Sequence, residues 1–143
     1  DPGNLGTLFR TAAAAGADAV LLMPGCADSF SPKVIRSGMG THFRLPIVKM
    51  DWDGAEHWLR GITGMQILAA DSDGGVSCWQ SDLRGPTAII IGSEGSGPCD
   101  RALSLADDRI LIPMPGAVES LNAGIAAGIL IFEVVRQRNE DKK

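Results

Sequence analysis

Chemically active side chains gather in the segment Ile112–Asn122, where a strand-like run leads into a long apolar helix. Within it the bend Pro113–Gly116 is followed by Glu119, Ser120 and Asn122. An ordinary strand-to-helix connection needs one capping oxygen. This one offers an acid, a hydroxyl and an amide beside the unpaired N–H groups of a helix start, which are suited to binding polar or anionic groups. The segment therefore predicts a ligand-binding corner.

Two further segments carry more polar and glycine residues than a simple turn requires, namely Asp1–Thr7 with Arg10, and Gly92–Pro98. Taken singly, Asn4 is typical of a turn or cap, and Arg10 of a solvent-facing side chain. The segment Gly92–Pro98 follows an apolar strand, a position where parallel α/β sheets bind ligands, and Glu94 is its only charge. The alternative is a plain glycine-rich turn. Its spacing matches neither a dinucleotide fingerprint, nor a P-loop, nor a hydrolase elbow.

Strand-like and helix-like runs alternate along the chain and must position these corners. We expect strands at about 18–23, 65–70, 87–92 and 109–112, and helices at about 5–15, 31–38, 53–61, 99–105 and 120–138. Alternation of this kind predicts a single α/β domain, residues 1–143, whose mostly parallel sheet is covered by helices on both faces. The continuously apolar run Ala88–Ile91 is typical of a strand buried on both faces. Ser120 is the predicted N-cap of the last helix.

The overall composition is that of a globular domain, with 45% hydrophobic and 21% charged residues. The net charge of −4 argues against nucleic-acid binding over the whole surface, and three Trp with four Phe argue against a stacking platform for single-stranded bases. Residues 33–49 are different, since they hold cationic groups and no acid: Lys33, Arg36, His42, Arg44 and Lys49. Two interpretations stay open, a solvated face or a phosphate-facing patch.

The three cysteines form no CxxC pair and lie near no histidine, so the sequence predicts no metal site and a reducing environment. The longest apolar run, within 121–135, predicts a buried helix rather than a membrane span. Its interruptions are Asn122, Gly124, Gly128 and Glu133. With no signal peptide visible, these features favour a cytoplasmic protein.

Taken together, the three segments resemble motifs one, two and three of the SpoU/TrmH-type RNA methyltransferases of the SPOUT superfamily, in order and in spacing. Motif one is matched by Asn4, Gly6, Arg10, Ala13 and Gly16, and motif two by Gly92, Glu94 and Gly97. Motif three is matched by Ile112–Met114, Gly116, Ser120–Asn122, Ala126 and Glu133. The pair Ala123–Gly124 departs from the usual Val-Ser. The family's first strand is also missing, so we expect the natural chain to extend upstream, often into an RNA-binding domain.

The resemblance implies a parallel α/β fold with a deep C-terminal trefoil knot, which binds S-adenosylmethionine and methylates a ribose 2′-hydroxyl of rRNA or tRNA. Residues implied to hold the cofactor are Gly92, Ile112, Met114 and Leu121. The family assigns deprotonation to the motif-one arginine, here Arg10, with Asn4, Ser120 and Asn122 positioning it and the ribose. Glu94 is expected to orient Arg10 or a helix N-terminus. A guanidinium stays protonated at neutral pH, so we favour stabilisation of the alkoxide or of a phosphate by Arg10.

Family enzymes are homodimers in which motif one of one protomer completes the site of the other, and the Gly124/Gly128 face is consistent with this. RNA contacts are expected at Lys33, Arg36, His42 and Arg44. The alternative function is a catalytically silent RNA- or cofactor-binding module of the same fold. All five catalytic candidates are present, whereas a decayed site should have lost some. A flavodoxin-type or P-loop nucleotide-binding enzyme lacks its fingerprint here.

Overall fold

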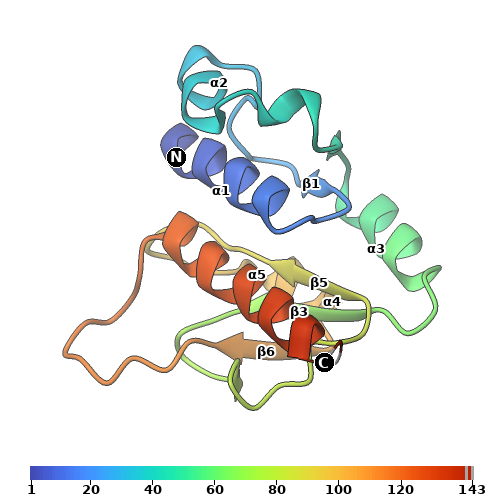
Figure 1. The fold of residues 1–143 in the computed structure, drawn as a ribbon, viewed down its shortest axis with the longest axis vertical. Helices are drawn as coiled ribbons and strands as arrows, with labels where there is room; N and C mark the ends of the chain where they lie inside the picture. Colours follow the sequence, from blue (N-terminus) through green and yellow to red (C-terminus); the bar gives the residue numbers. More distant parts are fainter. Residues whose placement is uncertain (141, 143) are drawn as a thin grey trace. The chain divides into compact units, whose positions relative to one another are not determined.

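The computed structural model describes residues 1–140 and 142, and its internal contacts divide the chain into two compact units, Asp1–Ala55 and Glu56–Lys143 (Figure 1). Unit 1 contains α1 (Pro2–Ala14), β1 (Val20–Leu22), α2 (Pro32–Gly38), the 3-10 helix η1 (Thr41–Phe43) and β2 (Ile47–Lys49). The helix α3 (Trp52–Arg60) begins in unit 1 and ends in unit 2.

Helix α1 begins earlier than its apolar periodicity predicts, because Asp1 is its N-cap. The Asp1 carboxylate accepts hydrogen bonds from the backbone N–H groups of Gly3 at 2.6 Å and Asn4 at 3.1 Å, and Pro2 occupies the first helical position. Asn4 therefore lies inside the first turn rather than before the helix. Arg10 is exposed.

Unit 1 is held together by a small core in which Phe9 of α1 contacts Leu22 of β1 and Val34 of α2. The strands β1 and β2 pair in parallel, with Val20 opposite Ile47. Gly6 permits the close approach of α1 and α2, since a Cβ there would overlap the Ser37 side chain. The glycine of motif one thus has a packing role within unit 1.

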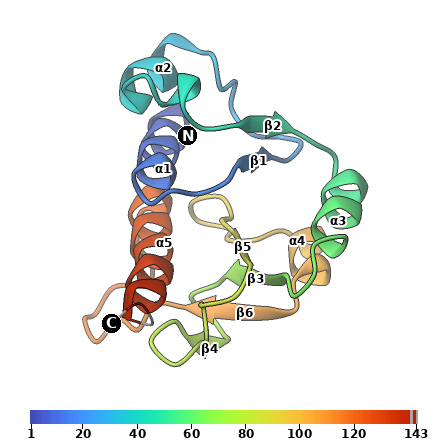
Figure 2. The same ribbon diagram turned by 45° about the vertical axis from the view of Figure 1, so that its right-hand side comes forward.

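Unit 2 contains a four-stranded parallel sheet in the order β4-β6-β3-β5. Its elements are β3 (Gln66–Ala70), β4 (Val76–Ser77), β5 (Thr87–Ile90), α4 (Asp100–Leu105), β6 (Asp108–Leu111) and α5 (Ala123–Glu140). Helices α5 and α4 lie on opposite sides of this sheet (Figure 2). The predicted class, parallel sheets flanked by helices, is confirmed, whereas the knot stays a prediction. Strand β5 is half-buried rather than buried, because it lies at one edge of the sheet in the described structure.

The core of unit 2 lies between α5 and the sheet, where Leu130 packs with Leu68, Cys78, Leu83 and Ile110. The pKa of the Cys78 thiol is raised, mainly because the side chain is buried. Within the described residues, no helix is long and apolar enough to cross a bilayer.

The buried side chain of Gln137 on α5 fastens the loop that precedes β5, and buried Glu133 accepts a hydrogen bond from Gln137. The Gln137 amide oxygen accepts the Leu83 N–H at 2.8 Å, and its nitrogen donates to the Ser81 carbonyl at 3.0 Å and to Glu133 at 2.8 Å. Glu133 also accepts from Arg136 at 2.7 Å, and this bond is the main reason that the pKa of Glu133 is lowered. The polar groups buried at this end of α5 are therefore paired, as buried polar groups must be.

Candidate functional site

The motif-two segment folds back on itself as a closed turn. The backbone groups of Ser93 and Gly97 exchange hydrogen bonds at 3.2 and 3.0 Å, and the hydroxyls of Ser93 and Ser96 lie 2.8 Å apart. Gly92 has no room for a side chain, because a Cβ there would overlap the Gly97 carbonyl and the Pro98 nitrogen. This glycine is therefore required by the close backbone approach inside the turn.

Glu94 projects from this turn to the start of α5. Its carboxylate accepts a hydrogen bond from the Asn122 side-chain amide at 2.7 Å and a longer one from the Ala123 N–H at 3.4 Å. A carboxylate at the first N–H of a helix is stabilised by the positive end of the helix dipole. Motif two is thus joined to motif three, and of the two contacts expected for Glu94, the contact with a helix N-terminus is present.

Asn122, not Ser120, is the N-cap of α5. The Asn122 side-chain oxygen accepts the N–H groups of Gly124 at 2.9 Å and Ile125 at 3.2 Å, and the helix begins at Ala123. The predicted cap at Ser120 is wrong, because Asn caps as well as Ser does and the Glu94 contact holds Asn122 at the helix start. Ser120 lies exposed in the preceding loop.

The loop between β6 and α5 is long and largely exposed (Figure 1). In the structure as described, the backbone groups of residues 113–121 make no hydrogen bond to other backbone groups. Ile112, Met114 and Leu121 are half-buried while the other residues of 113–120 are exposed, and Ile112 packs against the core of unit 2. The loop therefore offers peptide groups that are not engaged by other backbone groups, beside three half-buried apolar side chains.

The five catalytic candidates belong to two parts of the chain. Asn4 and Arg10 lie on α1 in unit 1, whereas Glu94, Ser120 and Asn122 belong to unit 2. Within unit 2, Glu94 and Asn122 are in direct contact. The predicted meeting of the α1 residues with motifs two and three stays a prediction.

The basic segment of unit 1 has exposed cations at Lys33, Arg36 and Arg44. His42 differs from them, since its ring packs edge-on against buried Phe9 with ring centres 5.3 Å apart, and its Nε2 lies 2.5 Å from the Ser29 carbonyl. His42 is thus half-buried and engaged in packing, and its expected contact with RNA stays a prediction.

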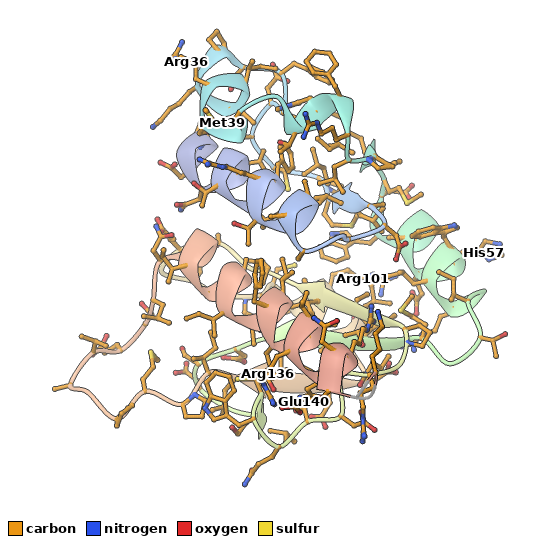
Figure 3. All side chains as sticks on the ribbon, viewed as in Figure 1. Arg36, Met39, His57, Arg101, Arg136 and Glu140 are labelled. Carbon is orange, nitrogen blue, oxygen red and sulfur yellow. The ribbon has the colours of Figure 1, made fainter. Side chains whose placement is uncertain are left out.

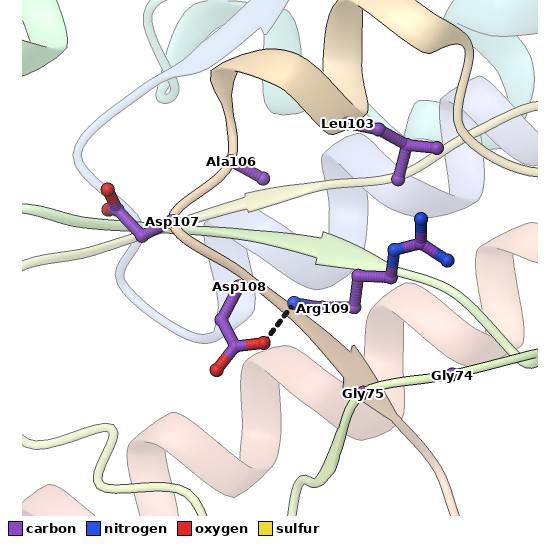
Figure 4. Close-up of a pocket in the computed structure, with 7 residues that line it drawn as sticks. All are labelled: Gly74, Gly75, Leu103, Ala106, Asp107, Asp108 and Arg109. Carbon is purple, nitrogen blue, oxygen red and sulfur yellow. Dashed lines mark hydrogen bonds between the residues drawn. The ribbon is translucent and has the colours of Figure 1, made fainter.

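A cavity of about 430 Å³ lies elsewhere in unit 2, where β6 begins (Figure 4). Its lining residues are Gly74, Gly75, Leu103, Ala106, Asp107, Asp108 and Arg109. None of them is a predicted site residue. Its cation Arg109 is paired with Asp71 at 3.1 Å, so the remaining acids do not favour an anionic ligand. The described residues contain no group of three or more His, Cys, Asp or Glu side chains that could hold a metal ion.

A family model described as the SpoU rRNA methylase family matches residues 1–132. The chain is 38% identical to an uncharacterized tRNA/rRNA methyltransferase of Synechocystis sp., over 96% of this chain and 50% of that protein. It is 37% identical to the 23S rRNA (guanosine(2553)-2'-O)-methyltransferase RlmP of Bacillus subtilis, over 94% of this chain and 54% of that protein.

A solved structure has the same fold. The crystal structure of the SpoU methyltransferase AviRb from Streptomyces viridochromogenes, in complex with the cofactor AdoMet, superposes with a TM-score of 0.91 at 33% identity. The match covers 97% of this chain and 54% of that one. The chain thus spans about half the length of the relatives described here.

Proposed function

Because the chain belongs to the SpoU rRNA methylase family, we propose that it transfers a methyl group from S-adenosylmethionine to a ribose 2′-hydroxyl of ribosomal or transfer RNA. The observation that carries the proposal is the hydrogen bond between Glu94 and Asn122, which joins the motif-two turn to the start of α5. The RlmP and AviRb relatives, named for 2′-O-methylation and AdoMet binding respectively, support the reaction and the cofactor.

The loop before α5 fits the cofactor. Its peptide groups, which bond to no other backbone group in the described structure, can recognise the edge of an adenine, and half-buried Ile112, Met114 and Leu121 can cover apolar faces of the ligand. Gly92 keeps the neighbouring turn closed against its own backbone. When bound, the cofactor supplies a methyl group that is activated by its attachment to a sulfonium sulfur.

Arg10 is the residue that we assign to the reacting ribose. A 2′-hydroxyl becomes a good nucleophile only as its proton leaves, so negative charge develops on the oxygen. A guanidinium stays protonated and donates hydrogen bonds, which suits stabilisation of that oxygen or of an adjoining phosphate. Asn4 and Ser120 are assigned to holding the ribose.

Asn122 is better described as a positioning residue than as a ribose ligand. Its side-chain oxygen already accepts two helix N–H groups, and its nitrogen donates to Glu94. A contact with ribose through the oxygen would therefore cost the cap of α5. We assign Asn122 and Glu94 together to fixing the end of the loop between β6 and α5, residues 112–122, which we call the cofactor loop.

A second copy of the chain is the proposed partner, with α5 at the interface. Ile125 and Phe132 are 53% and 46% exposed and lie seven residues apart, so they share one face of the helix. Gly128 lies between them on nearly the same face, where the absence of a side chain favours close approach of another backbone. A cytoplasmic location is part of the proposal, supported by the likeness to the B. subtilis enzyme.

The proposal is tested by transfer of a radiolabelled methyl group from S-adenosylmethionine to total RNA, with cofactor affinity measured separately by calorimetry. We expect Arg10→Ala to lower turnover by about 100-fold or more and to leave cofactor affinity unchanged. Arg84→Ala, which alters a surface ion pair with Asp82, serves as the control. Methylation by the Arg10→Ala chain at the rate of the unaltered chain would contradict the assigned role. A wild-type chain that binds cofactor and RNA without methylation would indicate the silent module instead.

A further inference from the structure

Three large apolar side chains are unusually exposed near α2 and η1. Phe43 is 91% exposed, Met39 69% and Phe30 67%. Phe43 is the most exposed large hydrophobic residue that the structure describes. Single exposed apolar residues are ordinary on a protein surface, but several of them within one short segment indicate an interaction surface.

The two aromatic residues stand on anchored backbone. Phe30 lies beside His42, with ring centres 5.5 Å apart, and its N–H is held by the Asp28 carboxylate at 2.9 Å. Phe43 ends η1, whose first residue Thr41 is buried and donates to the Gly38 carbonyl at 2.8 Å. Rings on fixed backbone lose little conformational freedom when they bind a ligand.

Met39 lies between Phe30 and Phe43 in the sequence and has a backbone φ of +52°, the only positive φ of a non-glycine residue among those described. It caps the end of α2, where Arg36 also lies (Figure 3). Its exposed thioether is flexible and can adapt to flat apolar ligands of different shapes.

The positive charge of this segment favours an anionic ligand. Lys33, Arg36 and Arg44 are exposed, and residues 29–50 contain no acid. A symmetric contact with a second copy would bring these like charges together, which is unfavourable. A single-stranded nucleic acid fits both the charge and the apolar side chains of the surface. Cations bind its phosphates, and aromatic side chains stack on its unpaired bases.

We propose that the aromatic–basic surface, defined as Phe30, Lys33, Arg36, Met39, Phe43 and Arg44, binds an unpaired stretch of RNA by stacking its bases on Phe30 and Phe43. The inference rests on the proposed function and specifies its substrate as RNA that is single-stranded at this contact. The small number of aromatic residues in the chain argues against a stacking platform. That count does not show that two of the four Phe are strongly exposed in one segment that also exposes three cations.

The test measures the affinity of the chain for a fluorescein-labelled single-stranded RNA by anisotropy, over a range of salt concentrations. We expect Phe43→Ala and Phe30→Ala each to weaken binding by about 5- to 150-fold without changing the salt dependence. Arg44→Ala should instead lower the slope of log affinity against log salt by about 0.7. Phe43→Trp should retain affinity and show emission quenched by RNA. Trp79→Ala, 52% exposed on unit 2, is the matched control and should bind as the unaltered chain does.

The outcomes separate this inference from the proposed function. If the unaltered chain methylates RNA and the Phe43→Ala variant binds RNA with the same affinity, the stacking surface is overturned and the methyltransferase proposal is left intact. If the unaltered chain does not methylate RNA but the Phe43→Ala variant loses RNA affinity, the proposed reaction is refuted and the stacking surface is supported. A change of the RNA-free oligomeric state on Phe43→Ala, measured by sedimentation, would show a protein interface and overturn the inference.

Discussion

Exchanging the chemical groups of the Glu94–Asn122 pair tests whether it acts as a positioning contact. In the double variant Glu94→Gln/Asn122→Asp, the amide and the carboxylate change places, so that a hydrogen bond can form in the reverse direction. The oxygen that caps α5 is retained, because Asp caps a helix as well as Asn does. Each single variant disturbs the pair, whereas the double variant restores it.

The magnitudes follow from the geometry. The wild-type bond is 2.7 Å long and both residues are exposed, so it contributes about 0.5–1 kcal/mol. Asn122→Asp alone loses this bond and places two carboxylates roughly 3 Å apart, which costs about 1.4 kcal/mol in water. We expect it to destabilise the chain by about 2 kcal/mol, and Glu94→Gln by about 0.5 kcal/mol because its amide can still accept. The double variant should lie within about 0.5 kcal/mol of the unaltered chain.

Urea unfolding of the four proteins, followed by circular dichroism, yields the coupling energy of this cycle. We expect about 2 kcal/mol of coupling, equivalent to roughly 8 °C in melting temperature between Asn122→Asp and the double variant. Equal and additive losses in the two single variants would refute the contact. Methyl transfer by the double variant then separates two roles of Glu94, because activity returns if the residue positions the loop and stays lost if its negative charge is needed.

Three further predictions concern the rest of the described structure. Hydrogen bonding from Arg136 lowers the pKa of Glu133 from its usual value of 4.5, so folding favours the charged form. Glu133→Gln should therefore be less stable than the unaltered chain at pH 7. The difference in unfolding free energy, measured by urea titration at each pH, should close as the pH falls below 4.5. Gln137→Ala leaves a buried backbone N–H without its acceptor and should cost about 1–3 kcal/mol by chemical denaturation. Gly92→Ala should lower the melting temperature by several degrees since its Cβ overlaps backbone, whereas Gly85→Ala, with open space around it, should not.

The strands β1, β3, β5 and β6 and the five α-helices could be predicted from apolar runs and periodicity, because that pattern reports which face of an element is buried. Strands β2 and β4 could not. Val76–Ser77 has no periodicity of its own and becomes a strand only by pairing with Ile110 and Leu111. Such short strands are determined by their neighbours in space, which the local sequence does not contain.

The same limit applies to the candidate site. Residue types and spacing predict that Glu94, Ser120 and Asn122 belong to one site, but they do not show which of the last two caps α5. That choice depends on Glu94, which is 28 positions away from Asn122 in the sequence. The role of Gln137 could not be predicted, because the residue lies in a charged stretch that is typical of a solvated helix end. The signal that points to it is Glu133, a lone acid in an apolar run that needs a buried partner.

The anchoring of the cofactor loop leads to a last prediction. One end is fixed by Ile112 in the core of unit 2, and the other by the contact of Asn122 with Glu94. Fixed ends reduce the conformational entropy that the loop loses on binding S-adenosylmethionine. Asn122→Ala releases one end without removing a proposed cofactor ligand, so it should weaken cofactor affinity by about 5- to 10-fold, which corresponds to roughly 1 kcal/mol. In calorimetry the loss should fall on the entropy of binding. A loss confined to the enthalpy would instead identify Asn122 as a direct ligand.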